Sequence, residues 1–533
     1  MTKELDYIVV GAGSAGCVLA SRLSENPSVQ VALLEAGPAD TSALIHCPMG
    51  MALLARSKQV NWQFETTPQP GLNGRRGYQP RGKALGGSSS VNAMIYVRGQ
   101  RADFDHWAAL GNKGWSFDEV LPYFLRTEDN ARGANAFHAT GGPLHVMDLP
   151  SPNPLAARFI EAGRQAGYPV NPDFNAESQE GVGMYQVTQK NGERHSVAKA
   201  YLTPHLQRPN LHVITGAHTC RVIMERKRAV GVEYFHEGQT KQLRAGREVL
   251  LSAGALQSPQ ILMLSGIGPK AHLLEHGIAP VQDLPGVGQH LHDHLDVTQV
   301  LDAPGLKESF GISVGGAARA VQGILEWRKH RTGMMTSNVG EAGGFLKSAA
   351  DKATPDLQLH FAVAKIIDHA RTLLLGHGVS CHVCVLQPLS RGSVSLASNN
   401  PFAAPRIDPN FLGDPQDIQP MVHGFKTLRT LLQQNALTSL GARESARSAH
   451  AVSDQDIEHL IRNTADTLYH PVGTCRMGPT DTDVVDAELR VHGVAGLRVV
   501  DASIMPRIIS GNTNAATIMI AEKAADFIKA SKA

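Results

Sequence analysis

A glycine-rich turn between two short apolar segments near the N-terminus constrains this chain most. Residues 6–10 (Asp-Tyr-Ile-Val-Val) are mostly apolar and β-branched and predict a buried strand. They lead directly into Gly11-Ala12-Gly13-Ser14-Ala15-Gly16, then into apolar residues at helical spacing and a second apolar run that ends in Glu35. Strand, glycine turn, helix, strand and acid in this order form the dinucleotide-binding βαβ unit.

Each position in this unit has a physical role. Gly11 allows the tight turn, Gly13 lets the backbone approach a pyrophosphate, and Gly16 lets the helix pack closely against the strand. The helix N-terminus supplies partial positive charge to the phosphates. Glu35 can accept hydrogen bonds from both ribose hydroxyls, and an acid here disfavours a 2′-phosphate. The sequence therefore predicts cofactor contacts at Gly11, Gly13, Ser14, Ala15, Gly16, Glu35 and Ala36.

Length and composition exclude several other classes of protein. A chain of 533 residues is too long for one compact core, so we expect two domains. The net charge of +2 gives no indication of nucleic-acid binding. The chain has no apolar run long enough to span a bilayer, and its first strand starts too early for a Sec-type signal peptide. The six cysteines lie mostly in apolar runs, which predicts reduced thiols and a cytoplasmic location.

The remaining chain returns twice to the first predicted sheet. Strand-like runs recur between Leu211 and Ser252, and a last strand over 497–500 precedes a C-terminal helix that begins near Ala515. Between them, residues 300–460 alternate glycine-rich stretches, strands and helical patterns. We therefore assign residues 1–155, 196–300 and 465–533 to a discontinuous nucleotide-binding domain, and 156–195 and 301–464 to a substrate-binding domain.

Two stretches allow two interpretations each. The loop over 81–99 has small residues and hydroxyls followed by an apolar segment, which fits a loop against a flat ligand or an ordinary surface turn. Residues 314–331 carry an apolar stripe that ends in basic residues. They form either a helix at a membrane surface or a helix packed on its own domain, and we favour the packed helix.

Histidine and cysteine clusters do not predict a metal site. Cys381 and Cys384 have the spacing of half a zinc site, but no second pair matches them and their alternation fits a strand. His290, His292 and His294 lie in a turn-rich loop, where structural or cofactor-proximal contacts are expected. No Gly-x-Ser-x-Gly elbow indicates a serine hydrolase.

His470 differs from these histidines because Pro471 and Gly473 hold it in a fixed turn close to the returning nucleotide-binding segment. A core histidine is the simpler alternative. Asn514, at the start of the last helix, has an equally simple alternative as its N-cap.

Four separated pieces of the sequence resemble the glucose-methanol-choline (GMC) family of flavoproteins, and the resemblance covers essentially the whole chain. These pieces are the βαβ unit with Glu35, the loop 81–99, the segment 254–268, and the pair 470–474 and 501–514. Within the family, the stretches 61–64, 185–192 and 336–345 resemble bacterial membrane-associated alcohol dehydrogenases of alkane oxidation.

The resemblance implies an α/β fold of the GMC or PHBH-like type, with a Rossmann-like FAD-binding domain and a discontinuous substrate-binding domain that contains an antiparallel sheet. It implies oxidation of an alcohol, with His470 and Asn514 as the active-site pair. Members with covalent flavin carry histidine where this chain has Val91, so noncovalent FAD is expected. The resemblance also implies FAD contacts at Arg81, Gly87, Ser88, Asn92, Ala93, Met94, Ile95, Ala253, Asp501, Ala502, Asn512 and Thr513, and an adenine contact near Val222.

Elementary chemistry agrees with this assignment. When the C–H bond of an alcohol breaks as hydride to flavin N5, the hydroxyl proton must pass to a base with a pKa near neutrality, and histidine meets that requirement. Asn514 could hold the substrate oxygen without competing for the proton. The helix N-terminus after it would stabilise the negative charge of the reduced flavin.

The predicted function is FAD-dependent oxidation of primary, aliphatic alcohols to aldehydes, with electrons passed to a quinone-like acceptor. An oxidase that uses O₂ is the nearest alternative. Choline is a further candidate substrate. Its quaternary ammonium group needs an aromatic cage, and Trp62 is the one obvious candidate for such a cage. Hydroxynitrile lyases of the family, which tend to use paired histidines, and flavin-binding sensors are alternatives of other classes. Peripheral association with the inner face of the cytoplasmic membrane stays open.

Overall fold

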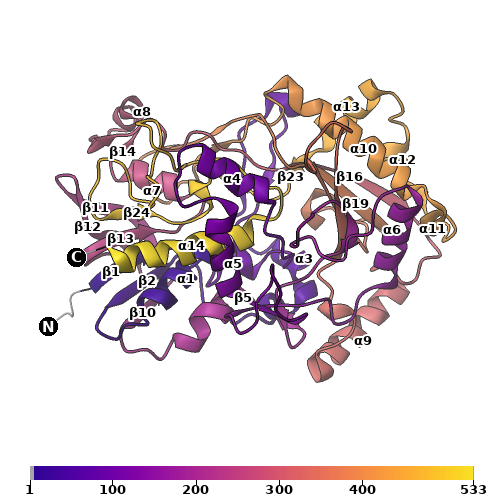
Figure 1. Cartoon of the computed structure of the whole chain (residues 1–533), viewed down its shortest axis with the longest axis horizontal. Helices are drawn as coiled ribbons and strands as arrows, with labels where there is room; N and C mark the ends of the chain where they lie inside the picture. Colours follow the sequence, from indigo (N-terminus) through magenta and orange to yellow (C-terminus); the bar gives the residue numbers. More distant parts are fainter. Residues whose placement is uncertain (1–4, 532–533) are drawn as a thin grey trace.

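Two sheets organise the computed structural model of this chain, which describes residues 5–531 (Figure 1). The strand order of the first sheet is β10-β2-β1-β13-β12-β11, and β24 also pairs with β13. The strands are β1 (Leu5–Val10), β2 (Val31–Glu35), β10 (Leu211–Thr215), β11 (His218–Glu225), β12 (Arg228–His236), β13 (Gln239–Leu251) and β24 (Leu497–Val499). β10, β2, β1, β13 and β24 run parallel, whereas β11 and β12 extend the sheet as antiparallel strands.

The predicted βαβ unit forms the centre of this first sheet. Helix α1 (Ser14–Leu23) connects β1 to β2, and both strands are buried on their two faces, as expected for parallel strands covered by helices. The last helix, α14 (Thr513–Ala530), packs against α1, so the two ends of the described chain lie together (Figure 1). The α/β fold with a Rossmann-like domain is therefore confirmed.

The second sheet is antiparallel throughout and has the order β22-β16-β19-β18-β17-β7, with β23 beside β16. Its strands are β7 (Gly181–Met184), β16 (Leu295–Asp302), β17 (Gly340–Leu346), β18 (Leu357–Ala362), β19 (Gly378–Val385), β22 (Arg443–Glu444) and β23 (Asp466–Thr467). Helices α6 (Pro154–Gln165), α10 (Ile418–Leu432) and α13 (Asp454–Thr464) contribute to its apolar core.

The predicted domain limits do not coincide with the limits of the second sheet at two of its strands. β16 (Leu295–Asp302) crosses the predicted limit at residue 300, and β23 (Asp466–Thr467) lies in the range assigned to the nucleotide-binding domain. The cause is long-range pairing with β19 and β16, which local sequence patterns do not reveal.

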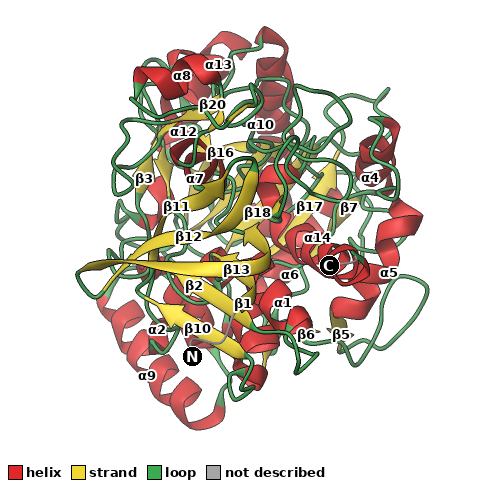
Figure 2. Ribbon diagram, turned by 90° about the vertical axis from the view of Figure 1, so that its left-hand side faces the viewer, coloured by secondary structure: helices red, strands yellow, loops and turns green. Residues whose placement is uncertain are grey.

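Shorter elements complete the description. The other helices are α2 (Ala43–His46), α3 (Met51–Leu54), α4 (Arg101–Ala109), α5 (Phe117–Thr127), α7 (Ser258–Leu264), α8 (Lys270–Glu275), α9 (Val314–His330), α11 (Asn435–Thr438) and α12 (Ala446–Ala449). The short strands are β3 (Phe64–Glu65), β4 (Tyr78–Gln79), β5 (Glu128–Asn130), β6 (Leu144–Val146), β8 (Gln189–Lys190), β9 (Glu193–Arg194), β14 (Ile267–Gly268), β15 (Gln282–Asp283), β20 (Ser393–Ser395) and β21 (Arg406–Asp408). Figure 2 shows the long strands β12 and β13 projecting from the first sheet.

Helix α9 does not pack in the way that its apolar stripe predicts. The side chains of Val314, Val321 and Leu325 are 92%, 59% and 62% exposed, so the prediction of a packed apolar face is wrong for most of the stripe. The helix attaches mainly through buried Trp327, whose Nε1 donates a hydrogen bond to the Gly192 carbonyl at 2.7 Å. Both views show α9 at the edge of the molecule (Figures 1 and 2).

Two general expectations can be compared with the structure. Within residues 5–531, no helix is both long and apolar enough to cross a membrane. All six cysteines are unpaired thiols, and five of them are buried.

Candidate active site

A cavity of about 690 Å³ lies where the parallel strands of the first sheet end and the second sheet begins. Strand ends of a doubly wound sheet are where such folds bind ligands. The cavity brings together nearly all residues that the sequence singled out: Gly11, Gly13, Ser14, Ala15, Glu35, Ala36, Trp62, Arg81, Gly87, Ser88, Asn92, Ala93, Met94, Ile95, Ala253, Asp501, Ala502, Asn512, Thr513, Asn514 and His470.

Gly16 does not line this cavity, but its geometry fits its predicted packing role. A Cβ atom built on Gly16 would lie 1.8 Å from the carbonyl oxygen of Gly11, so any side chain would push α1 away from the turn. At Gly11 the backbone φ is +92°, and a Cβ atom would meet the Ser252 carbonyl at 2.6 Å. Both glycines are therefore required for the tight strand-to-helix connection.

Glu35 is held at the end of β2 by two backbone amides. Its Oε2 accepts a hydrogen bond from the Ala12 amide at 2.9 Å, and its Oε1 accepts one from the Gly37 amide at 2.8 Å. Burial raises the pKa of Glu35 to about 7, although these two amides act in the opposite direction. The carboxylate is thereby fixed on the cavity wall, where hydroxyl groups of a ligand could stabilise its charge.

Val222, like Gly16, is a predicted cofactor contact that does not line the cavity. It lies in β11 outside the cavity, and its amide donates a hydrogen bond to Ser265 Oγ at 2.8 Å. Only the start of β11 reaches the cavity, through His218 and Thr219, because the strand then runs along the antiparallel extension of the sheet. Thr219, three residues before Val222, is the last residue of β11 that lines the cavity, so the adenine contact expected near Val222 stays a prediction.

Several features of the cavity fit a flavin dinucleotide. The first turns of α1 and α14 meet there, since Ser14 Oγ donates a hydrogen bond to Asn514 Oδ1 at 2.6 Å. Two helix N-termini at one place favour negatively charged groups such as phosphates. Ser252 Oγ, Asn338 Oδ1 and both ring nitrogens of His360 are buried at the cavity without a hydrogen-bond partner among residues 5–531. A polar ligand would satisfy them.

His470 stands at the end of the cavity formed by the second sheet, and its ring is oriented by a chain of hydrogen bonds. His294 Nε2 lies 3.0 Å from the Leu386 carbonyl, which can only accept, so this nitrogen carries the proton of neutral His294. His294 Nδ1 is then an acceptor and lies 2.9 Å from His470 Nδ1. The proton of neutral His470 is therefore on Nδ1, and Nε2 is unprotonated.

The surroundings also fix the charge of His470. Burial is the main cause that lowers its pKa well below the usual value, and the nearby His294, His360 and Arg81 act in the same direction. Burial lowers the pKa of His294 to about 4, so both rings are neutral at pH 7. The His470 amide donates a hydrogen bond to Asp293 Oδ1 at 2.8 Å, which holds the turn in place. A neutral, oriented imidazole with a free Nε2 can accept a proton.

The asparagine that faces His470 is Asn512, so the predicted pairing with Asn514 is wrong. Asn512 Nδ2 lies 3.3 Å from His470 Nε2, and its Oδ1 accepts a hydrogen bond from Gln358 Nε2 at 3.0 Å. Asn512 is also the N-cap residue of α14, but its side chain caps nothing. Asn514 lies two residues further, about 200° around the helix, and contacts Ser14 instead.

Two histidines of the site were not predicted to act there. His294 belongs to the loop for which only structural or cofactor-proximal contacts were expected, and its neighbour His292 does make such contacts with the His290 carbonyl and the Ile508 amide. His360 lies on β18 and lines the cavity. A histidine inside the largely apolar run 357–363 was an available signal for it.

Trp62 lines the cavity, but its ring already has protein neighbours. Phe64 stacks parallel to it with ring centroids 5.6 Å apart, and Lys83 Nζ lies 4.4 Å from the ring centroid. His218, at the start of β11, packs edge-on against it at 5.9 Å. These contacts place Trp62 beside the first sheet, with the Lys83 ammonium group over its ring.

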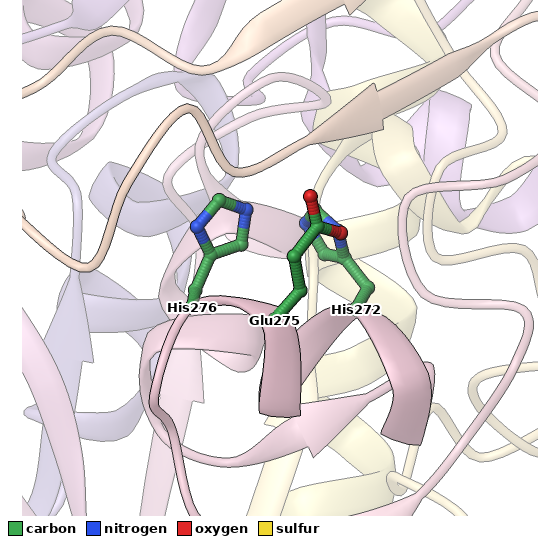
Figure 3. Close-up of side chains that lie close together, drawn as sticks. All are labelled: His272, Glu275 and His276. Carbon is green, nitrogen blue, oxygen red and sulfur yellow. The ribbon is translucent and has the colours of Figure 1, made fainter.

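A cluster of His272, Glu275 and His276 on α8 has side chains close enough to suggest a metal site (Figure 3). His272 Nε2 accepts a hydrogen bond from the Leu396 amide at 3.0 Å, so the proton of the neutral ring is on Nδ1, the atom that faces Glu275. Nδ1 would have to lose this proton to bind a metal. None of the three residues lines the cavity, and we assign no metal to them.

Fold and cavity together define an oxidoreductase that binds a flavin dinucleotide, and comparisons with known proteins agree. Models of the GMC oxidoreductase family match residues 5–296 and 388–521. The chain is 48% identical over 526 residues to the alcohol dehydrogenase [acceptor] of Pseudomonas putida, covering 98% of this chain and 95% of that protein. It is 44% identical over 540 residues to the mitochondrial choline dehydrogenase of Homo sapiens, covering 99% and 90%.

A solved structure leads to the same assignment. A formate oxidase variant of Aspergillus oryzae RIB40, in a study of FAD modification, superposes with a TM-score of 0.91 at 28% identity and covers 99% of this chain and 98% of its own. The chain belongs to the GMC oxidoreductase family, and it is an FAD-binding enzyme that acts on alcohol-type donors.

Proposed function

We propose that this protein oxidises primary, aliphatic alcohols to aldehydes with noncovalently bound FAD, and that a quinone-like acceptor receives the electrons. The observation that carries the proposal is the unprotonated Nε2 of His470, which faces the Asn512 amide in the cavity. FAD, when bound, supplies a hydride acceptor for the substrate carbon. The alcohol assignment also rests on the similarity to the Pseudomonas putida protein.

The protein's own residues would handle the proton and the orientation of the alcohol. His470 Nε2 takes the hydroxyl proton, because its other nitrogen is already protonated and bonded to His294. Asn512, whose Oδ1 is fixed by Gln358, turns its Nδ2 donor toward the same place and would hold the substrate oxygen. The sequence predicted this role for Asn514, and we propose it for Asn512 instead. Holding alcohol and base together removes part of the entropic cost of the reaction.

Choline is the main competing substrate, since choline dehydrogenases are also similar to this chain. A quaternary ammonium group needs a free carboxylate or open aromatic faces. Asp296 lines the cavity, but its Oδ2 is engaged by His382 Nδ1, which also lies 2.9 Å from Thr298 Oγ1. The ammonium group of Lys83 lies over the face of the Trp62 ring. These contacts favour an uncharged alcohol.

A lyase of the family is the alternative from another class. The sequence argument for it required paired histidines, and in this chain the residue that faces His470 Nε2 is Asn512. Asparagine cannot take part in proton shuttling as a second base, which favours the oxidation of alcohols.

The test compares kcat/KM for straight-chain primary alcohols and for choline, with a soluble quinone or with O₂ as acceptor. We expect turnover of neutral alcohols with the quinone, at least tenfold higher kcat/KM than for choline, and slow reaction with O₂. A preference for choline would contradict the substrate assignment, and equal rates with O₂ would identify an oxidase.

Helix α9 supports peripheral attachment to a membrane, where a lipid-soluble quinone would be available. Ile312 forms hydrogen bonds with Gly376, so the exposed side chains of Val314 and Leu375 belong to neighbouring segments. The helix ends with Arg328 and Lys329, which would attract anionic lipids. We expect co-sedimentation with phosphatidylglycerol vesicles, and weaker binding in Val314→Glu and Leu375→Glu variants. No binding by the unmodified protein would contradict attachment.

A further inference from the structure

Arg194 on β9 is a buried cation without a carboxylate partner. Three arginines are buried within residues 5–531, and two of them have an acid: Arg98 bonds Glu128 at 2.6 Å and Arg498 bonds Glu248 at 2.7 Å. Arg194 is 1% exposed, yet the described chain offers it no salt bridge. Removing an unpaired charge from water is unfavourable by several kcal/mol, so its retention needs a reason.

All contacts of Arg194 go to backbone or amide oxygens of segments beside the cavity. Nε donates to the Ile45 carbonyl at 2.9 Å. Nη1 donates to the Ser89 carbonyl at 3.2 Å, to the Asn92 carbonyl at 2.6 Å and to Asn92 Oδ1 at 2.9 Å. Nη2 is buried without a partner in the part of the chain that the structure describes. Burial lowers the pKa of Arg194 to about 9, which still leaves it charged at pH 7.

These contacts orient the loop that lines the cavity. Its next two carbonyls are also bonded from behind: Ala93 oxygen accepts from Asn338 Nδ2 at 2.9 Å, and Met94 oxygen accepts from the Thr188 amide at 2.8 Å. Within residues 5–531, the amides of Ala93 and Ile95 have no acceptor, and both residues line the cavity. The loop therefore turns carbonyls toward the protein and leaves amide donors for a ligand.

We infer that Arg194 is a positioning residue for FAD: it orients the 89–95 loop, and its charge behind that loop favours the reduced, more negatively charged state of the cofactor. The counter-charge missing from the protein is then supplied by the cofactor itself. This inference rests on FAD binding and not on the identity of the alcohol, so it can fail while the proposed function holds, and the reverse.

The test measures the midpoint potential of the bound flavin, with no alcohol present, in the unmodified protein and in Arg194→Gln and Arg194→Lys variants. Gln keeps hydrogen-bonding ability without charge, and Lys keeps the charge without the planar fork. We expect Arg194→Gln to shift the reduction equilibrium at least tenfold toward oxidised flavin, about 30 mV for a two-electron couple. Arg194→Lys should shift it less than threefold.

Arg208 provides a matched control, because its Nη1 also donates to a carbonyl, but that carbonyl belongs to Ser21, which does not line the cavity. Arg208→Gln should leave the potential unchanged. A folded Arg194→Gln protein that takes up no FAD would also support the inference, because the loop would then depend on Arg194. An FAD-loaded Arg194→Gln protein with the original potential would overturn it, as would equal shifts in the Gln and Lys variants.

Discussion

Replacing His294 tests the origin of the basicity of His470. In a His294→Leu variant, His470 Nδ1–H loses its acceptor and the Leu386 carbonyl loses its donor. One hydrogen bond contributes about 0.5–1.5 kcal/mol, and 1.4 kcal/mol corresponds to about a tenfold change in an equilibrium. The tautomer with a free Nε2 is then less populated and the ring less well oriented. We expect the rate of flavin reduction by an alcohol to fall about tenfold, against about 10²–10⁴ for loss of the base itself in His470→Ala.

The same variant should change the pH dependence. His294 is uncharged above about pH 4, so near neutrality it acts on His470 as the acceptor of its Nδ1–H, and this hydrogen bond favours the protonated ring. Its removal lowers the pKa of His470, and because the base must be unprotonated, activity should persist to a lower pH on the acid side. The assay is anaerobic flavin reduction followed by absorbance between about pH 5 and 9.

His492→Asn is a suitable control, since His492 bonds the Gly478 carbonyl at 3.0 Å outside the cavity. A folded, FAD-loaded His294→Leu protein with unchanged rate and unchanged acid limb would refute the argument that His294 selects the tautomer of His470.

Three further predictions concern other positions of the site. Gly16→Ala should abolish FAD loading, because its Cβ would lie 1.8 Å from the Gly11 carbonyl oxygen; a normal flavin-to-protein ratio would show that the turn can adjust. Glu35→Gln should weaken FAD binding about tenfold, since one of the two amide donors loses its acceptor; equal dissociation constants would remove Glu35 from cofactor binding. Asn512→Ala should slow flavin reduction about 10–100-fold with full FAD content, whereas Asn514→Ala should mainly weaken FAD binding. If the two variants showed the opposite effects, Asn514 and not Asn512 would be the active-site partner of His470.

The parts of the fold that could be predicted are those encoded in contiguous sequence. The βαβ unit and Glu35 follow from one stretch of the first 35 residues, in which periodicity and glycine spacing agree. The limits of the two domains could not be predicted from the sequence with the same accuracy. β16 has the pattern of any buried strand, and only its pairing with β19, about 80 residues later, assigns it to the second sheet.

The site shows the same limit at the level of single residues. The histidine and an asparagine were predicted, but spacing alone does not reveal where α14 begins, and each residue turns the side chain by about 100°. That rotation exchanges Asn514 for Asn512. His294, in the loop before β16, and His360, on β18, reach His470 from distant segments, and no local pattern encodes their meeting.

The most direct test of alcohol oxidation by this protein is its visible spectrum under anaerobic conditions, before and after addition of a medium-chain primary alcohol. We predict that the oxidised flavin bands bleach within the time of turnover and that His470→Ala, loaded with FAD, bleaches about 10²–10⁴-fold more slowly. A flavin spectrum that no primary alcohol bleaches, or equal bleaching rates in the two proteins, would contradict the assignment of His470 as the base for alcohol oxidation.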